Sequence, residues 1–407
     1  MEIGTLADTG KLTGTVMLRV DFNSPIDPSS NQILDDKRFR EHLPTVQALE
    51  DARLVVLTHQ SRPGKKDFTT LEAHAAKLER LLGRPVTYVE DIFGRCARDA
   101  IRSAKRGDVL MLENLRFAAE ENLTLKPEEA KKTLLVRRLA SMADVYVNDA
   151  FGTAHRSQPS IVGGLPLVLP SVAGLLMEKE VANLSRVFSG APASRHLRAR
   201  RDEGGRLDSG RRERPRARNG RPGDRRRRGG KRLFACGGPR YRAPSARLID
   251  DLGYRAEIDK AKDLLESYRD RLSLPHSVAV REDGERVEYP PLDAVPEEAQ
   301  VLDIGSDSIG SLTRTISDSG TVVVNGPAGL FEEEQFAVGT FELLRAASTV
   351  EFSVVGGGHS GAAIERLGLE SEFTHISTGG GGAAIEFLTG KKMPAIEALE
   401  MSRKIFG

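Results

Sequence analysis

The chain of 407 residues has no tryptophan, 5% aromatic residues and two cysteines, Cys96 and Cys236. With so few aromatic side chains, recognition of single-stranded nucleic acid by base stacking is not expected. Two isolated cysteines form neither a metal-binding motif nor a disulfide framework, which predicts a cytoplasmic protein. The chain has no apolar run near the roughly 20 residues of a membrane helix, and no signal-peptide pattern begins it. We therefore expect neither a membrane nor a nucleic-acid partner.

Short apolar runs alternate with amphipathic, helix-like stretches from the start of the chain. The predicted strands of the first half are 15–20, 54–57, 109–112 and 145–147, and the helix-like stretches include 69–82 and 125–142. Short apolar strands separated by helices are typical of a parallel sheet covered on both faces. The pattern predicts an α/β protein, and its length favours two domains.

The same alternation resumes in the second half of the chain. Residues 171–189 have the three- and four-residue apolar spacing of a helix, which we interpret as a link between two lobes. Beyond residue 245, strands are predicted at 276–280, 299–304, 321–325, 351–355 and 373–377. Each half of the chain is thus expected to build its own sheet.

The residues between 193 and 243 do not fit this alternation. Residues 195–242 contain 18 arginines and one lysine against five acidic residues, with almost no apolar periodicity. A disordered basic loop and an arm that binds nucleic acid are two interpretations. We favour a third, translation in the wrong reading frame, because the α/β pattern stops near Pro192 and resumes abruptly near Pro244. A structureless insert of this length inside a compact domain also argues against a native element.

Polar side chains follow the predicted strands of the first half. They are Asp21, Asn23, His59, Arg62, Arg116 and Arg156, and Arg38 lies in a loop before a helix. Ligands of such sheets bind beyond the carboxyl ends of the strands, and guanidinium groups match carboxylate and phosphate oxygens. Each arginine alone is also consistent with a solvated ion pair, and Asp21 and Asn23 with caps of the next turn. Together these residues predict one site for a small polyanion.

Two glycine-rich turns, 353–361 and 376–382, connect strands to helices near the C-terminus. Such turns direct backbone N–H groups and a helix dipole at phosphate. Gly356, Gly358 and Gly361 have the spacing of the dinucleotide fingerprint, which by itself would suit a nicotinamide-dependent dehydrogenase. That enzyme needs an acidic residue at the end of the next strand to hold the ribose, and Ser377-Thr378-Gly379 stands there instead.

A third turn follows the strand at 321–325. Gly326 allows close backbone approach, and Glu332 is a candidate to hold a ribose, although an acid favoured by a helix dipole would look the same. The P-loop signature is absent, since Gly10-Lys11 is followed by Leu12 and lacks the preceding glycine. We therefore expect a nucleotide site without a P-loop.

These motifs, in this order, resemble those of the phosphoglycerate kinase family. The matching segments are Arg19-Val-Asp21-Phe-Asn23, Asp36-Lys-Arg38, Leu57-Thr-His59-Gln-Ser-Arg62, Glu113-Asn-Leu-Arg116, Asn148-Asp-Ala-Phe-Gly-Thr-Ala-His155-Arg156, Asn325-Gly-Pro-Ala-Gly, Gly356-Gly-Gly-His-Ser360 and Ser377-Thr-Gly-Gly-Gly381. The resemblance covers residues 1–190 and 244–407, and the Gly-Gly-Gly-His motif is similar to that of the archaeal branch.

The resemblance implies an α/β fold of two Rossmann-like three-layer domains with mainly parallel sheets, joined by a helix. The implied parts are a 3-phosphoglycerate-binding domain at 1–172, an interdomain helix at 173–190, a nucleotide-binding domain at 191–390 and a tail at 391–407 that packs back toward the first domain. The implied protein is a monomer.

The implied activity is reversible phosphoryl transfer between ATP and 3-phosphoglycerate, giving ADP and 1,3-bisphosphoglycerate, with Mg²⁺ as cofactor and no metal-binding side chains assigned. Carried over residue by residue, the substrate contacts are Asp21, Phe22, Asn23, Arg38, His59, Gln60, Ser61, Arg62, Arg116 and Arg156. The nucleotide contacts are Gly326, Glu332, Gly356, Gly357, Gly358, His359, Ser360, Thr378, Gly379, Gly380 and Gly381. The implied catalytic positions are Arg38, aimed at the transferring phosphoryl group, and Gly358.

The Arg-rich segment departs from the family pattern. The family has a Gly-Gly-Ala-Lys motif after the linker helix, whose lysine reaches the nucleotide phosphates, and a second glycine-rich strand–helix unit follows it. Both would fall within 193–242, where neither is present. The chain as written is therefore expected to fold poorly and to be nearly inactive.

Overall fold

The computed structural model describes residues 2–162, 165–189, 233–234, 255–290, 294–296 and 298–407. The chain divides into two compact units. The first combines Met1–Ala191, Thr321–Pro327 and Ser353–Gly407, and the second combines Pro192–Gly320 and Ala328–Phe352. Nearly all of the Arg-rich segment lies outside the described residues, so our interpretations of it remain predictions.

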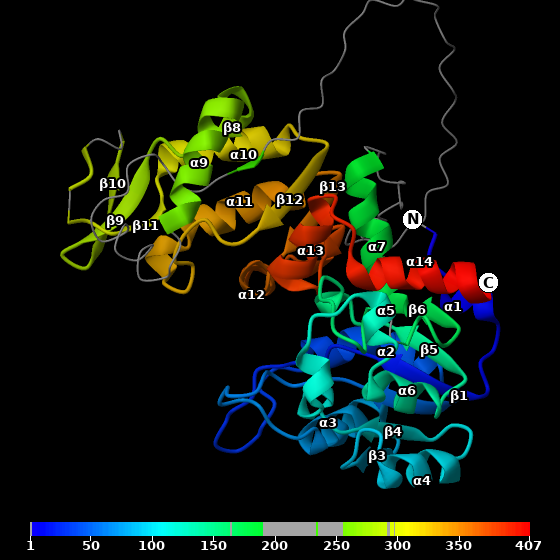
Figure 1. Ribbon diagram of the computed structural model, residues 1–407. Helices are drawn as coiled ribbons and strands as arrows, with labels where there is room; N and C mark the ends of the chain where they lie inside the picture. The colour runs from blue at the N-terminus through cyan, green and yellow to red at the C-terminus, as the bar shows by residue number, and fades with distance from the viewer. Residues whose placement is uncertain (1, 163–164, 190–232, 235–254, 291–293, 297) are drawn as a thin grey trace, which may run out of the picture. The chain divides into compact units, whose positions relative to one another are not determined.

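The first unit contains a six-stranded parallel sheet in the order β3-β4-β2-β1-β5-β6 (Figure 1). Its strands are β1 (Thr15–Arg19), β2 (Arg53–Leu57), β3 (Val86–Val89), β4 (Val109–Leu112), β5 (Val145–Asn148) and β6 (Ser171–Ala173). Successive side chains of a strand point to opposite faces, so Val16 and Leu18 enter one apolar core and Met17 enters the other. Burial on both faces explains why these strands read as continuous apolar runs.

Helices cover both faces of this sheet. The helices of this part of the chain are α1 (Leu6–Thr9), α2 (Lys37–Ala48), α3 (Glu72–Leu82), α4 (Arg95–Ser103), α5 (Pro127–Ala130), α6 (Leu134–Ala140) and α7 (Leu175–Ser189), of which α2 and α3 pack on one face and α4 and α6 on the other. Phe39 and Val46 of α2 pack with Leu18 on one face, whereas Leu135 and Leu139 of α6 pack with Met17 on the other.

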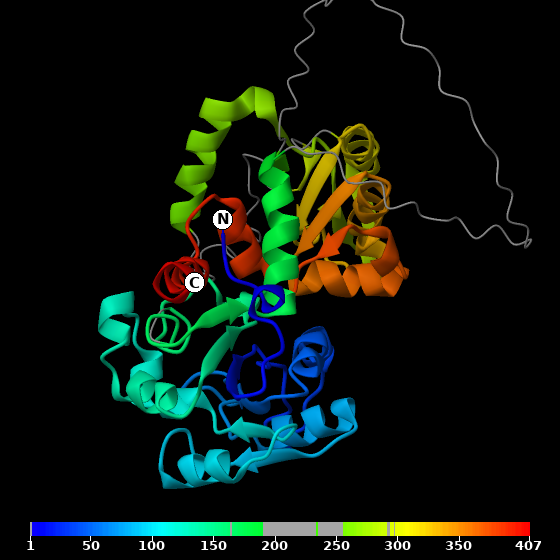
Figure 2. The same ribbon diagram turned by 90° about the vertical axis from the view of Figure 1, so that its right-hand side faces the viewer.

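The C-terminal part of the chain completes the first unit. A small sheet in the order β12-β13-β14 combines β12 (Thr321–Asn325), β13 (Phe352–Gly356) and β14 (His375–Ile376), and the helices are α12 (Gly358–Leu367), α13 (Gly380–Leu388) and α14 (Pro394–Phe406). Helix α14 lies against β6 (Figure 1 and Figure 2). The backbone N–H of Ala395 donates to the carbonyl of Ala154 at 3.1 Å, and Ser402 donates to that of Leu169 at 3.3 Å. Residues 391–407 thus contact the part of the chain that forms the parallel sheet.

The second unit contains a short antiparallel sheet. The described elements of this unit are β7 (Leu233–Phe234), α9 (Arg255–Tyr268), β8 (Leu272–Ser273), β9 (Val278–Glu282), β10 (Glu285–Tyr289), β11 (Val301–Ile304), α10 (Ser306–Ser317) and α11 (Val338–Ser348). Strands β10, β9 and β11 pair antiparallel. The β9–β10 hairpin turns at Asp283-Gly284, both with positive φ, as a two-residue hairpin requires. We did not predict β10, although the Asp-Gly pair is a sequence signal for it.

The predicted α/β class with mainly parallel sheets is confirmed. The prediction that 171–189 is one helix was wrong at its start, because residues 171–173 pair with β5 as an edge strand and α7 begins at Leu175. The stretch 125–142 forms two short helices, α5 and α6, because Thr133 caps a new helix through a hydrogen bond from the Val136 N–H. Within the described ranges, every helix falls short of the length and apolar character that crossing a membrane requires.

Candidate functional site

The carboxyl ends of β1, β2, β4 and β5 meet at one edge of the parallel sheet, because these strands are neighbours with the same direction. Asp21, His59 and Arg116 follow three of them, and Arg38 stands in the first turn of α2. An Nη1 hydrogen of Arg38 is donated to the buried carboxylate of Asp21. Burial favours the neutral acid, but the surrounding positive groups, Arg38 first among them, outweigh it and hold the pKa of Asp21 well below its ordinary 3.8. Asp21 is therefore an anion at neutral pH.

His59 is held in one protonation state by Arg19. Arg19 is fully buried and can only donate, so the Nδ1 atom of His59, 3.1 Å from Arg19 Nη2, is an acceptor. Burial and the nearby Arg19 place the pKa of His59 well below 6.5, so the ring is neutral and carries its proton on Nε2. Nε2 is buried and has no partner among the described residues. An unused N–H donor of this kind suits an anionic ligand.

Three further arginines, Arg62, Arg116 and Arg156, lie near one another. Burial, Arg156 and Arg19 lower the pKa of Arg116 to about 10. Burial also lowers the pKa of Arg156, and Arg62 adds to the effect while Asp21 opposes it. Like charges lower the pKa of a cation only when they are near. The predicted anion-binding arginines are therefore gathered in one electropositive region, as expected from their positions at strand ends.

Other predicted substrate residues use their side chains to hold the surrounding loops. Phe22 is fully buried and stacks on Phe39 with ring centroids 4.2 Å apart. The amide of Gln60 accepts from the N–H of Ser24 at 3.2 Å and donates to its carbonyl at 3.0 Å. Through its Oδ1 atom, Asn23 accepts from the backbone N–H of Ser61 at 2.7 Å. In Ser61 itself, Oγ donates to Asp67 and the carbonyl accepts from Arg116.

The glycine-rich turns form two uncapped helix N-termini. Gly357 has a φ of 94° between β13 and α12, and Gly326 has a φ of 87° after β12, both conformations that favour glycine. The N–H of Gly326 donates to Ser360 Oγ at 2.9 Å, which joins two of the predicted nucleotide segments. Neither α12 nor α13 receives a side-chain hydrogen bond at its N-cap. Their first-turn N–H groups are therefore available to an anion.

Residues adjacent in sequence to the two predicted sets approach each other within the first unit. Lys37 Nζ lies 3.6 Å from where a Cβ on Gly361 of α12 would stand. His155 Cε1 lies 3.8 Å from the corresponding point on Gly382 of α13, and the ring of Phe151 lies 2.7 Å from that on Gly379. The predicted Glu332 is exposed and belongs to the second unit.

Glu180 of α7 holds the turn that precedes α13. Its carboxylate accepts from Thr378 N at 2.6 Å, Thr378 Oγ1 at 2.7 Å, Ser377 Oγ at 2.9 Å and His375 Nε2 at 2.8 Å. Burial raises the pKa of Glu180, but the hydrogen bonds from His375 and Thr378 outweigh it, so the pKa lies below 4.5. Nothing in the sequence marked Glu180, because it occupies an ordinary buried position of a helix.

Replacing this carboxylate should destabilise the first unit in a pH-dependent way. Glu180→Gln is expected to lower the free energy of unfolding by about 1–3 kcal/mol at pH 7. The side-chain NH₂ of glutamine would face hydrogen-bond donors that now bind a carboxylate oxygen. A depressed folded-state pKa stabilises the fold above the unfolded value of 4.5, and this stabilisation is lost as the pH falls further. The difference between the chains should therefore shrink below pH 4.5, which calorimetry can follow. Glu178→Gln is the matched control, and equal stability of Glu180→Gln and the parent at pH 7 would refute the role.

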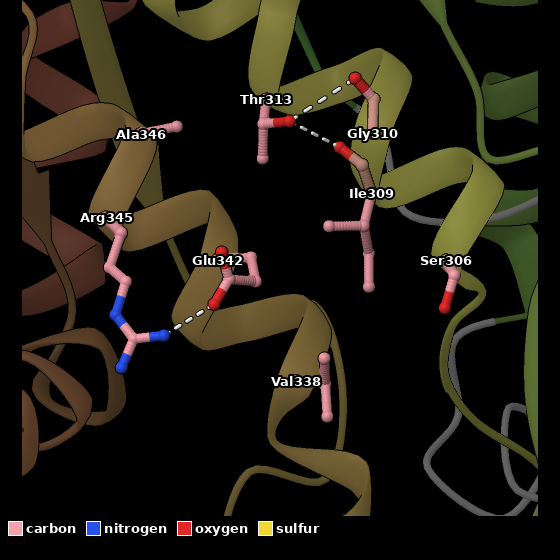
Figure 3. Close-up of a pocket in the computed structure, with 8 residues that line it drawn as sticks. All are labelled: Ser306, Ile309, Gly310, Thr313, Val338, Glu342, Arg345 and Ala346. Carbon is pink, nitrogen blue, oxygen red and sulfur yellow. Dashed lines mark hydrogen bonds and ion pairs between the residues drawn. The ribbon is translucent and has the colours of Figure 1, made fainter.

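The second unit has a surface hollow of about 590 Å³ between α10 and α11 (Figure 3). Its lining residues are Ser306, Ile309, Gly310, Thr313, Val338, Glu342, Arg345 and Ala346. Arg345 pairs with Glu342, and Thr313 donates to the carbonyl of Ile309 at 2.8 Å. No predicted site residue lines this hollow. In the part of the chain that the structure describes, no group of three or more His, Cys, Asp and Glu side chains is placed to hold a metal ion.

Comparison with known protein families identifies the family of this chain. The sequence model of phosphoglycerate kinase matches residues 7–196 and 245–391. The chain belongs to the phosphoglycerate kinase family. Phosphoglycerate kinase of Methanocorpusculum labreanum is 58% identical over 410 residues, and the alignment covers 100% of this chain and 100% of that protein. Phosphoglycerate kinase 2 of Methanosarcina acetivorans is 43% identical, over 95% of this chain and 92% of its own.

Solved phosphoglycerate kinases have the same fold. The enzyme of Pyrococcus horikoshii OT3 matches with a TM-score of 0.81 and 34% identity, covering 99% of this chain and 100% of its own. That of Coxiella burnetii matches with a TM-score of 0.71 and 26% identity, covering 98% and 99%. The predicted family, its archaeal character and a phosphotransferase activity are thereby confirmed, and the dehydrogenase and nucleic-acid-binding alternatives gain no support. The gap between the two family-matched ranges falls on the Arg-rich segment.

Proposed function

We propose that this chain catalyses reversible phosphoryl transfer between ATP and 3-phosphoglycerate, giving ADP and 1,3-bisphosphoglycerate. The observation that carries the proposal is the cluster of neighbouring arginines with the unpartnered His59 N–H, in a chain of the phosphoglycerate kinase family. Positive charges held close together repel one another, and binding of a polyanion relieves this repulsion. 3-Phosphoglycerate supplies two anionic groups of the required kind.

The substrate-binding residues that we propose are those of the parallel-sheet edge. Arg62, Arg116 and Arg156 supply guanidinium forks for phosphate or carboxylate oxygens, and His59 donates through Nε2. Asp21 contacts Arg38 and accepts from the backbone N–H of Asn23, and we propose Asp21 and Asn23 as acceptors for a substrate hydroxyl. The side chains of Phe22, Gln60 and Ser61 would then act by fixing these loops.

The nucleotide-binding residues that we propose are the glycine-rich turns. Backbone N–H groups at the starts of α12 and α13 suit the phosphates of ATP, and we propose that Mg²⁺ binds with those phosphates as part of the substrate. Glu332 is proposed as the ribose contact. We further propose a cytoplasmic monomer, with a substrate domain at 1–172, a helix at 173–190 and a nucleotide domain at 191–390.

In the proposed reaction a carboxylate oxygen of 3-phosphoglycerate forms a bond to the γ-phosphorus of ATP. The bond from that phosphorus to the β–γ bridging oxygen breaks, and ADP leaves with the electron pair. Such transfer needs positioning and cancellation of charge, with no covalent protein intermediate. Among described residues Arg38 is engaged only through Nη1, so Nε and Nη2 remain to contact the moving group. Gly358, with open space where a Cβ would stand, lets that group approach the backbone.

A coupled assay of ADP formation tests this proposal. ADP should accumulate from MgATP only when 3-phosphoglycerate is added, and the rate should saturate with each substrate. The assay is run on the chain as written and on a chain whose residues 193–243 come from another reading frame of the same DNA. A rate of ADP formation that does not depend on 3-phosphoglycerate in either chain, or binding of NADH in preference to ADP, would refute the proposal.

A further inference from the structure

His42 lies on α2 between two groups of the first unit and was not among the predicted site residues. The residue is buried, with 2% exposure. The backbone N–H of Asp21 donates to His42 Nε2 at 3.1 Å, and His42 Nδ1 lies 2.8 Å from Asp149 Oδ2. His42 therefore connects the main chain of a proposed substrate residue to a buried carboxylate 107 positions away.

The partners leave His42 a single arrangement of its proton. A backbone amide can only donate, so Nε2 is the acceptor and carries no hydrogen. The neutral ring then has its proton on Nδ1, which donates to Asp149. The other oxygen of Asp149 accepts from the N–H groups of Leu176 at 2.9 Å and Met177 at 3.1 Å, in the first turn of α7. Both Asp149 oxygens thus face donors, which fixes the orientation of the carboxylate and of the ring.

Helix α2 contacts Asp21 at two points. Arg38 contacts its carboxylate, and His42, one turn later on the same helix, contacts its backbone N–H. Asp21 is thus held at its carboxylate and at its backbone N–H by one helix, which leaves the residue little freedom to shift. Removing the ring would leave a buried N–H without an acceptor, which is costly enough to move the loop.

We propose that His42 is a positioning residue for 3-phosphoglycerate, which holds Asp21 in register with Arg38 while Asp149 fixes its tautomer. The inference rests on the proposed function and adds to it a residue that touches no substrate. A purely structural role would lower stability alone, whereas a positioning role changes the affinity for 3-phosphoglycerate and spares that for ADP.

The test measures binding to the full chain by calorimetry, together with the unfolding temperature. His42→Leu is expected to weaken 3-phosphoglycerate binding about tenfold, the size of one lost buried hydrogen bond, with ADP binding unchanged. His42→Gln keeps a carbonyl acceptor for the Asp21 N–H and should recover most of the affinity. The control is Thr45→Val, because Thr45 accepts from Leu175 N at 3.1 Å on the same two helices without contacting Asp21. It should lower the unfolding temperature and leave 3-phosphoglycerate binding unchanged.

Asp149→Asn provides a second route to the same result. An amide at this position must turn its NH₂ toward either His42 or α7, and facing His42 it favours the Nε2–H tautomer, which repels the Asp21 N–H. We expect weakening similar to that of His42→Leu, and no further loss in the double variant. Parent-like affinity for 3-phosphoglycerate in both single variants would overturn the role of His42. Failure of both the parent chain and the frame-corrected chain to bind 3-phosphoglycerate would overturn the proposed function instead.

Discussion

Replacing residues 193–243 by the translation of the same DNA in another frame is expected to raise kcat by on the order of 10³-fold. In the family this stretch supplies a lysine that contacts the nucleotide phosphates, and one charged donor at a transferring phosphoryl group has an effect of about this size. The chain as written has four consecutive arginines at 225–228 and no Gly-Gly-Ala-Lys motif. The family match breaks between 196 and 245, where the departure lies.

The measurement is the coupled assay on the two chains, with ADP affinity and soluble yield recorded alongside. Substituting alanine for the restored lysine is the control, and it should return kcat most of the way to that of the chain as written. The affinity for 3-phosphoglycerate should change little, because its proposed contacts lie in residues 21–156. Equal kcat in the two chains, or no α/β-like pattern in the other frames, would show that the Arg-rich segment is genuine.

Arg38→Ala in the frame-corrected chain is expected to reduce kcat by about 10²–10³-fold with a smaller effect on KM for 3-phosphoglycerate. Arg38 is about one-third exposed, and only its Nη1 is engaged among described residues, by Asp21. A donor that contacts the moving phosphoryl group stabilises the transition state more than the bound substrates. Asp21 would also lose its nearest cation, so its pKa should rise toward 3.8.

Steady-state kinetics with both substrates varied separates kcat from KM. Arg38→Lys keeps the charge without the planar fork and should recover only part of the rate. Arg40→Ala is the matched control, because Arg40 is an exposed arginine of the same helix that pairs with Asp36. It should leave kcat unchanged. A Michaelis constant that rises while kcat stays constant in Arg38→Ala would place Arg38 in substrate binding alone.

The central strands were predictable because each is buried on both faces and therefore continuously apolar. β1 and β4 have every residue buried, and their predicted ranges agree with the structure to within a residue. β3 has an exposed and a half-buried residue in its middle, and β10 is mostly charged, so neither stands out from its surroundings. Edge strands of this kind are defined by pairing with a neighbour, which no local pattern records.

Some of the site residues were likewise predictable from the sequence and others were not. Arg116 and His59 were predictable because the chain delivers them directly at strand ends, and the fold brings strand ends together. Arg19, His42 and Glu180 were missed because each occupies a position of a strand or helix that would ordinarily be apolar. Their partners are distant: 107 positions separate His42 from Asp149, and 195 separate Glu180 from His375. Such pairs become visible only in three dimensions.

The placement of α14 has a consequence for biosynthesis. Ile396 and Leu399 are buried, and the helix lies on β6, a strand made more than 200 residues earlier. While the ribosome is still translating the middle of the gene, the apolar surface that α14 will cover stays uncovered. The parallel-sheet unit can therefore finish its assembly only after residues 394–406 have been synthesised, and until then this apolar surface is open to aggregation.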